Sequence, residues 1–133
     1  MIGKLNSYLG FNESALKLRA YRQEVLSSNI ANADTPHYKA QDFKFADVLQ
    51  SAAKSQSNFQ MARSNGRHLE AKGFSAFEPR LSFRNESQPS IDGNTVETDV
   101  EMAHFSDNAI RYQAEITFLN SKISSLRSAI QGN

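Results

Sequence analysis

The chain has 133 residues, with 15 Lys and Arg against 14 Asp and Glu, and it contains no cysteine. Lack of cysteine excludes disulfides, thiolate metal sites and cysteine nucleophiles. The formal net charge of +1 is unlike the strongly basic balance of most nucleic-acid-binding domains, so we expect no nucleic-acid partner. No run approaches the roughly 18 apolar residues of a transmembrane helix, and no apolar signal segment follows Met1. We expect one small domain with a modest core, no direct membrane insertion and no cleaved signal peptide.

A first helix is predicted near the N-terminus. Residues from Phe11 to Asn29 recur at four- and three-residue spacing, which places them on one helix face. Pro36 disfavours helical geometry at the preceding residue, so the helix should end by about Asn32. Asn12 is a candidate N-cap, and the helix is therefore predicted over Glu13–Asn32. The apolar positions that we expect to take part in assembly are Phe11, Ala15, Leu18 and Val25.

A second and stronger periodic segment lies near the C-terminus. Its apolar residues keep unbroken four-three spacing over more than three heptads, which is the pattern of a coiled-coil interface. Thr98 and Glu101 have the spacing of a capping box, and Gly132 is a suitable C-cap, so a helix is predicted over Asp99–Gln131. These residues form what we call the C-terminal seam: Phe105, Ala109, Tyr112, Ile116, Leu119, Ile123, Leu126 and Ile130.

The length of this second helix bears on function. At 1.5 Å per residue it spans roughly 50 Å, more than the diameter of a compact domain of this size. The first helix can therefore cover only part of the seam, and an uncovered apolar stripe usually marks an interaction surface. An intramolecular helical hairpin or bundle is the alternative, but the pattern favours assembly.

The segment from 51 to 95 is more polar, and its apolar residues are sparse. Asn65-Gly66 and Asp92-Gly93 are tight-turn signals. Leu81-Ser82-Phe83 alternates like a short strand, which suggests a β-hairpin near residues 74–93. The segment is otherwise expected to be irregular. Just before it, four apolar residues indicate a short helix after the first turn: Phe45, Val48, Leu49 and Ala52.

Chemistry-bearing constellations are sparse. His37, His68 and His104 are far apart and lack the spacing of metal ligands. The acidic residues Glu97, Asp99 and Glu101 resemble an acid–base cluster, but their simpler role is to complement the dipole at a helix N-terminus. No phosphate-binding loop or nucleophile motif is present. We therefore expect no catalytic, cofactor or metal site, and no enzyme activity.

The turn after the first helix carries a family resemblance. Residues 28–38 read Ser-Asn-Ile-Ala-Asn-Ala-Asp-Thr-Pro-His-Tyr, which closely resembles the Asn-Ile-Ala-Asn and Thr-Pro-Gly-Tyr-like turn of bacterial flagellar axial proteins. Segments 40–43, 88–96, 105–114 and 118–120 extend the resemblance. The Asp-Gly-Asn-Thr-Val segment and the short chain favour the proximal rod proteins over the hook and distal rod. The motif residues are Asn29, Ile30, Ala31, Asn32, Asp34, Thr35, Pro36 and Tyr38.

Two features of this turn leave alternatives open. His37 stands where the family usually has Gly, so either the backbone keeps a negative φ there or histidine accepts a positive one at some cost. Asn29 and Asn32 either cap the helix end or, if buried, fix register in a helical assembly, and the two roles can coexist.

The resemblance implies a mainly α fold. Its N- and C-terminal helices would pair in a coiled-coil-like inner layer, and the central segment would project outward with irregular or short β structure. Three parts follow: residues 1–35 with the first helix and the Asn-rich turn, residues 36–97 with the central segment, and residues 98–133 with the long helix.

The resemblance also implies a mechanical function. The chain would be a structural subunit of the periplasmic basal-body rod that assembles helically and transmits torque. Its partners would be copies of itself, other rod proteins, and base-side ring, adaptor and export-gate components of the motor. It would be exported by the flagellar type III system without signal cleavage. The alternative is a helical adaptor or secreted effector that binds a partner helix through the C-terminal seam.

Overall fold

A computed structural model describes residues 2–57, 79–85 and 90–132. Most of these residues are helical, which confirms the predicted mainly α fold. In chain order the elements are the helix α1 (Ile2–Ala31), the strand β1 (Gln41–Asp42), the helix α2 (Phe45–Ser57), the strand β2 (Ser82–Phe83) and the helix α3 (Thr98–Gln131).

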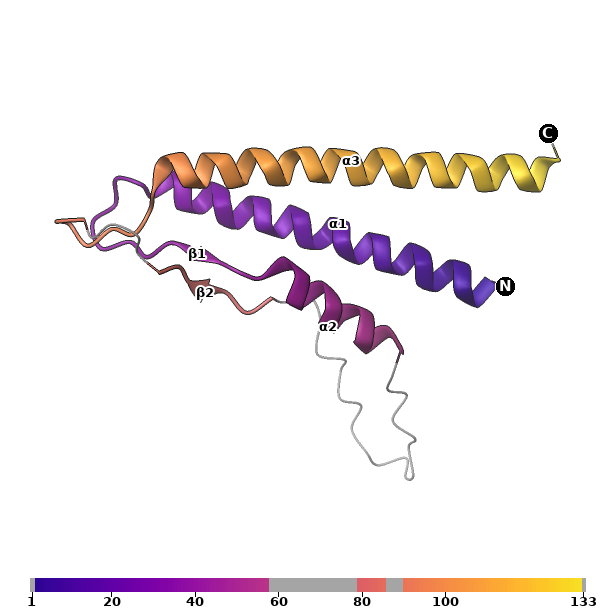
Figure 1. Ribbon diagram of the computed structural model, residues 1–133, viewed down its shortest axis with the longest axis horizontal. Coiled ribbons are helices and arrows are strands. Elements are labelled where there is room, and N and C mark those ends of the chain that lie inside the picture. Colours follow the sequence, from indigo (N-terminus) through magenta and orange to yellow (C-terminus); the bar gives the residue numbers. More distant parts are fainter. Residues whose placement is uncertain (1, 58–78, 86–89, 133) are drawn as a thin grey trace, which may run out of the picture.

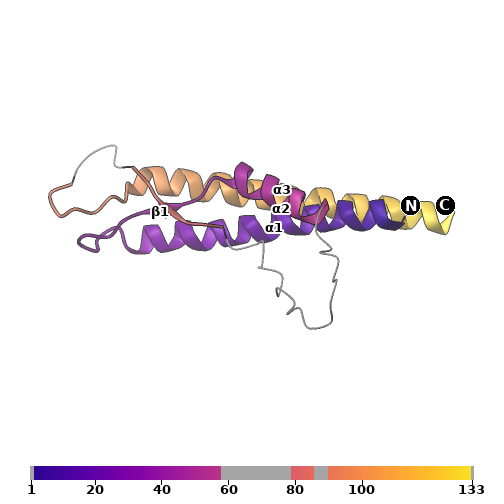
Figure 2. The same cartoon turned by 90° about the horizontal axis from the view of Figure 1, so that it is seen from below.

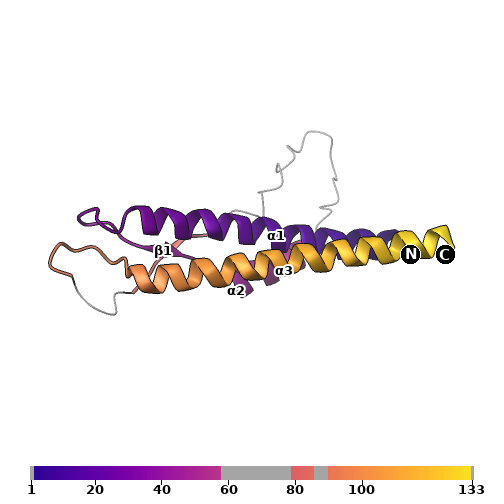
Figure 3. The same cartoon turned by 90° about the horizontal axis from the view of Figure 1, so that it is seen from above.

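The two long helices lie side by side and run in opposite directions, so that both chain ends lie at the same end of the molecule (Figure 1). The views from below and above show the same elongated pair (Figures 2 and 3). Figure 1 also places α1 between α3 on one side and α2 with the small sheet on the other. Helix α1 is therefore the central element, which contacts α3, α2 and β1.

Helix α1 ends next to the predicted residue but begins much earlier. The prediction placed its start at Glu13, whereas the helix begins at Ile2. Asn12 is not its N-cap, because it lies within the helix and its Nδ2 donates to the carbonyl of Tyr8 at 2.8 Å. The helix continues through polar residues near the N-terminus, where neither the apolar stripe nor the N-cap candidate Asn12 indicates its true start.

Helix α3 has the predicted length, but the predicted capping box is wrong. The N-cap is Glu97, and no side-chain hydrogen bond caps the helix there. Glu101 does not reach back to the helix start, because its buried carboxylate bonds other elements. At the other end Gly132 is confirmed as the C-cap, with a φ of 74° and its N–H bonded to the carbonyl of Ser128 at 3.1 Å.

The central segment is partly as predicted. The short helix is confirmed as α2, and Ser82–Phe83 forms the expected strand. Its partner is β1, antiparallel, with Gln41 opposite Phe83. The described part of residues 74–93 therefore contains no local hairpin, and the rest of that segment lies outside the described residues, as does the Asn65-Gly66 turn signal. The Asp92-Gly93 turn is present, closed by a bond from the Gly93 N–H to the Ser90 carbonyl at 3.1 Å.

The apolar core of the described residues is small and gathers around α1. In this core the aromatic rings of Tyr21 and Phe43 stack against each other, with their centroids 5.8 Å apart. Such a core supports only modest stability by itself. Its buried apolar residues are Ala15, Leu18, Val25, Leu26, Ala40, Phe43 and Ala52.

Candidate assembly interface

A partly buried network of charged side chains connects the small sheet to both long helices. Arg22 of α1 forks onto the Asp42 carboxylate, with distances of 3.1 Å from Nε and 2.9 Å from Nη2. Arg84 donates from Nη2 to Asp42 at 2.8 Å and from Nη1 to Glu101. Glu101 is fully buried, so its charge depends on these partners. The network therefore holds α1, β1 and α3 together with the residue that follows β2.

The ionisation of Asp42 reflects this network. Burial alone raises the pKa of its carboxyl, but the hydrogen bonds from Arg22, the Phe43 N–H and Arg84 outweigh burial and lower the pKa below the ordinary value. The same contact raises the pKa of Arg22, whose charged form is held mainly by its hydrogen bond to Asp42. Both groups are therefore stabilised in their charged forms.

Asn29 lies where α1, the small sheet and α3 meet. Its Nδ2 donates to the Gln41 carbonyl at 2.8 Å and to Glu101 Oε2 at 3.1 Å. Its Oδ1 accepts from the Gln41 N–H at 3.1 Å and from the Tyr38 hydroxyl at 3.3 Å. Asn29 is fully buried and uses its side chain to fix α1 relative to α3 within one chain, while Asn32 Nδ2 caps the Ser28 carbonyl at 2.8 Å.

The segment before α3 closes over the Asn-rich turn. The buried Asn94 donates from Nδ2 to the carbonyls of Asn32, Ala33 and Thr35 at 3.1, 2.6 and 2.9 Å. All three carbonyls belong to the turn that follows α1, so Asn94 anchors this turn from a distant part of the sequence. The two motifs that carry the family resemblance are thus in direct contact.

His37 has a backbone conformation with positive φ, at the position where the family usually has glycine. Its φ is 62°, which resolves the open alternative in favour of a positive φ. Its N–H donates to the Asp92 carbonyl at 3.1 Å, and its ring lies against Gly93, where an added Cβ would come within 2.9 Å of Nδ1. A side chain larger than hydrogen at Gly93 would therefore collide with the His37 ring.

The remaining motif residues lie on the surface or at partial depth around this turn. Tyr38 is half-buried against Asn29. Ile30 and Asn32 have intermediate exposure, and the exposed motif positions are Ala31, Asp34, Thr35 and Pro36.

The contact between α1 and α3 is polar. Asn108, fully buried, donates from Nδ2 to the Arg19 carbonyl at 2.9 Å and to Gln23 Oε1 at 2.6 Å. Arg19 donates to Glu115 at 2.6 Å and lies over the Phe45 ring, 4.2 Å from its centroid. Glu101, Asn108 and Glu115 recur every seven residues, so they form one column of α3, and α1 packs against that polar column.

The C-terminal seam is displaced from this contact. Its residues Ala109, Ile116, Ile123 and Ile130 form a second, apolar column beside the polar one. The seam residues Phe105, Tyr112, Ile116 and Leu119 are partly exposed, and Ala109 is exposed. Toward the C-terminus Ile123, Leu126 and Ile130 are 48%, 38% and 85% exposed. Within one chain, therefore, the first part of the seam is largely covered and its C-terminal end is exposed.

The predicted assembly positions on α1 divide into two groups. Ala15, Leu18 and Val25 are buried in the chain's own core, whereas Phe11 is 39% exposed. Leu5 and Tyr8 are similarly exposed nearby. The N-terminal part of α1 thus carries uncovered apolar side chains at the same end of the molecule as the exposed end of α3 (Figure 1).

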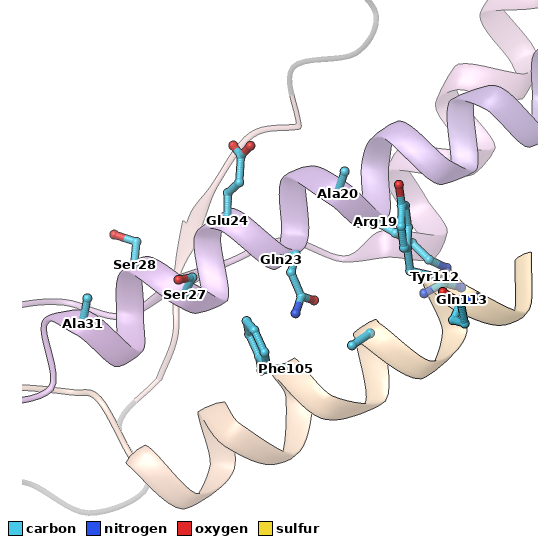
Figure 4. Close-up of a pocket in the computed structure, with 11 residues that line it drawn as sticks. Arg19, Ala20, Gln23, Glu24, Ser27, Ser28, Ala31, Phe105, Tyr112 and Gln113 are labelled. Atoms are coloured by element: carbon cyan, nitrogen blue, oxygen red, sulfur yellow. The ribbon is translucent and has the colours of Figure 1, made fainter. Parts of the chain in front are cut away.

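A groove of about 870 Å³ runs between α1 and α3. Ala20 and Glu24 of α1 and the seam residues Phe105, Ala109 and Tyr112 contribute to its lining. Figure 4 shows Gln23 and Phe105 pointing toward one another across the space between the helices, while Glu24 points away from α3. The part of the seam between Phe105 and Tyr112 therefore lines this groove, together with polar side chains of α1.

Several functional residues were missed from the sequence. Arg84, Asp42 and Asn94 act over long sequence separations and carry no local signal. A local signal did exist for Glu101, Asn108 and Glu115. They keep heptad spacing with one another and four-three spacing with Phe105 and Tyr112. A pattern of apolar residues alone omits these three polar positions, which share a helix face with Phe105 and Tyr112.

Neither an ion site nor a membrane span is found among the described residues. No group of three or more His, Asp or Glu side chains lies close enough there to hold a metal ion. No described helix combines the length and apolar character needed to cross a membrane.

Comparison with known proteins supports the family resemblance of the Asn-rich turn. Residues 9–39 match the family of flagella basal body rod proteins. The chain is 39% identical over 135 residues to the flagellar basal body rod protein FlgB of Proteus mirabilis strain HI4320, covering 98% of each chain. It is 44% identical over 124 residues to FlgB of Cereibacter sphaeroides strain ATCC 17029, covering 93% of this chain and 94% of that one.

The chain therefore belongs to the FlgB family of flagellar basal body rod proteins, whose members are structural subunits of the rod. This confirms the resemblance drawn from the Asn-rich turn. The buried contacts of Asn29 and Asn94 explain what those motifs do: they join the end of α1 to the start of α3.

Proposed function

We propose that this chain forms the proximal part of the rod and transmits torque by assembling helically with copies of itself and with other rod proteins. Its further partners would be base-side ring, adaptor and export-gate components of the motor. It would reach the periplasmic rod through the flagellar type III system, without removal of a signal peptide. The role is mechanical and requires no catalytic group.

One observation carries this proposal: the C-terminal end of the seam is apolar but exposed. Ile123 and Ile130 are exposed at 48% and 85%, although a 34-residue helix presents them in a continuous stripe. Exposed apolar stripes of this kind are energetically unfavourable in water and are usually covered by a partner. In a repeating polymer, each subunit would supply the cover for its neighbour.

Nothing in the relatives favours the alternative, a helical adaptor or secreted effector. FlgB proteins are named for the basal body rod in Proteus mirabilis and in Cereibacter sphaeroides alike. The same seam that would bind one partner helix in an adaptor serves repeated contacts in a rod.

A substitution in the seam tests the proposal. Ile123→Glu places a charge in the proposed packed interface, which should cost several kcal/mol in assembly, on the order of 3 kcal/mol or more. We expect cells that carry only this variant to lose swimming in soft agar and to lack the subunit in purified basal bodies. Ser124→Glu is the matched control, because Ser124 is exposed one residue further along the same helix. Normal swimming with Ile123→Glu would contradict the proposal.

A further inference from the structure

We infer that a small socket between α1 and the two-stranded sheet receives a lysine side chain from a different protein of the basal body. The socket has a volume of about 190 Å³, and its lining includes Glu24, Val25, Ser28, Tyr38 and Leu81. It lies toward the sheet, on the side of α1 that faces away from α3 (Figure 1). The inference rests on the proposed function, because it names a contact that forms in the assembled rod.

Glu24 gives the socket a negative charge that the chain itself does not balance. Its side chain is exposed and points away from α3 (Figure 4). Among the described residues it forms no hydrogen bond or ion pair. A helical ion pair would need a basic residue three or four positions away, but all four of those positions are uncharged: Ala20, Tyr21, Ser27 and Ser28.

The two hydroxyl groups of the socket add acceptors to this carboxylate. Tyr38 uses its single hydroxyl proton to donate to Asn29 Oδ1 at 3.3 Å. Ser28 Oγ lies 3.4 Å from the Tyr38 hydroxyl, so Ser28 is the donor in this contact. Both protons are thereby used within the chain, and only oxygen lone pairs remain for a ligand.

A lysine side chain matches this set of groups. Its ammonium carries three N–H donors and no acceptor, and Glu24, Ser28 and Tyr38 each offer an acceptor. Val25 and Leu81 also line the socket, so the methylene groups of lysine can lie against apolar walls. The planar guanidinium of arginine instead favours two parallel bonds to one carboxylate, which would leave the hydroxyls unused.

The chain's own basic side chains do not occupy the socket. None of the described residues that line it is basic. Arg22 and Arg84 are both bonded to Asp42, and Lys44 and Arg80 line a different groove beside α2. A second copy that offered Lys44 would use the same side of the molecule as the socket, and such a pairing closes instead of extending a rod. The lysine therefore belongs to a different protein.

Carbodiimide cross-linking of purified basal bodies tests this contact, because it joins a carboxylate to an amine only where the two groups touch. Mass spectrometry should show Glu24 linked to a lysine of another protein. The exposed Glu13–Lys17 pair, 2.5 Å apart, provides a reference link within the chain. Glu24→Gln should abolish the new link. Asp99→Asn is the matched control, since Asp99 is exposed outside the socket, and it should leave the link unchanged.

The hydroxyl acceptors give a second readout in the same samples. Ser28→Ala removes one acceptor but keeps Glu24, and it should lower the Glu24 link several-fold relative to the reference link. Ser27→Ala is the matched control, because Ser27 is also exposed and lines the groove between α1 and α3 but not the socket. Circular dichroism of each variant establishes that its helices are intact.

Each outcome decides between the alternatives. A Glu24 link to a lysine of this chain's own sequence would assign the socket to a second copy and overturn the inference. Equal links in Ser28→Ala and Ser27→Ala would also overturn it. Basal bodies that give the reference link but no Glu24 link would reject this contact and leave the rod function intact, whereas normal swimming with Ile123→Glu would reject the function itself.

Discussion

Glu101 shows how a single buried charge organises this chain. Its carboxylate is fully buried on α3, yet it bonds Asn29 of α1 and Arg84 beside β2. Two hydrogen-bonded partners from different elements offset the cost of removing the charge from water. The position of the central segment is therefore coupled to the pairing of the long helices through one side chain.

Loss of Arg84 should be strongly destabilising. Arg84→Ala leaves Glu101 buried without its cationic partner, which typically costs about 3–5 kcal/mol. Chemical denaturation followed by circular dichroism measures this loss. Arg111→Ala is the control, because the Arg111–Asp107 pair is exposed and its removal should cost less than about 0.5 kcal/mol. Equal free energies of unfolding for the two variants would show that the Arg84–Glu101 contact contributes nothing to stability.

Stability should also fall in acid because of Asp42. Its pKa is lowered in the folded chain by Arg22, the Phe43 N–H and Arg84 against the effect of burial. A lowered folded-state pKa contributes stability above the unfolded value, and that contribution is lost as the pH falls through the folded value. We expect the free energy of unfolding to decline below pH 3.8, the ordinary value for Asp. Asp42→Asn should show a shallower decline, and identical slopes would contradict this assignment.

The motif residues were found from the sequence, but their partners were not. Asn29, Asn32 and Tyr38 stand in a recognisable local pattern, and each is involved in the turn. Asp42 and Arg84 are 42 residues apart, so only tertiary structure brings them together. The strained φ of His37 likewise depends on the distant Asp92 and Gly93.

At the scale of elements, α3 carries two columns with different roles. The polar column of Glu101, Asn108 and Glu115 pairs with α1 inside the chain. The apolar column that begins at Ala109 continues into the exposed C-terminal part of the helix. Polar contacts in a helix pair fix one register and orientation at some cost in stability. We expect the exposed C-terminal part of the apolar column to make contacts between subunits.

The ends of the long helices should open more readily than their middles in the isolated chain. Residues 118–131 of α3 and 3–12 of α1 have few buried side chains, whereas residues 15–29 and 101–108 contain most of the buried positions. Amide hydrogen exchange should therefore be fast at the ends and slow in the middle. Both ends should become protected in assembled basal bodies. Uniform protection in the isolated chain would contradict this expectation.

Helix α3 was predictable as an element, whereas the start of α1 was not. An unbroken heptad pattern and Gly132 define α3, and both signals are local. Near the N-terminus, Asn6, Ser7 and Asn12 interrupt the apolar pattern, although the helix continues through them. The partner of β2 was also unpredictable, because a two-residue strand carries too little pattern to specify register.

At the scale of the whole molecule, the chain is a pair of long helices whose apolar side chains are covered only in part. Both termini lie at one end (Figure 1), where Phe11 and Ile123 are exposed. The core around Leu18 and Leu26 holds the other half together. In this FlgB-family subunit the end that carries both termini exposes apolar side chains, which we expect neighbouring subunits in a rod to cover.

The structure of an intact basal body, determined by electron cryo-microscopy, tests this account most directly. We predict that Ile123, Leu126 and Ile130 will be covered by helices of neighbouring subunits. Exposure of these three side chains to solvent in the assembled rod would contradict the central claim that subunits complete one another's apolar stripes.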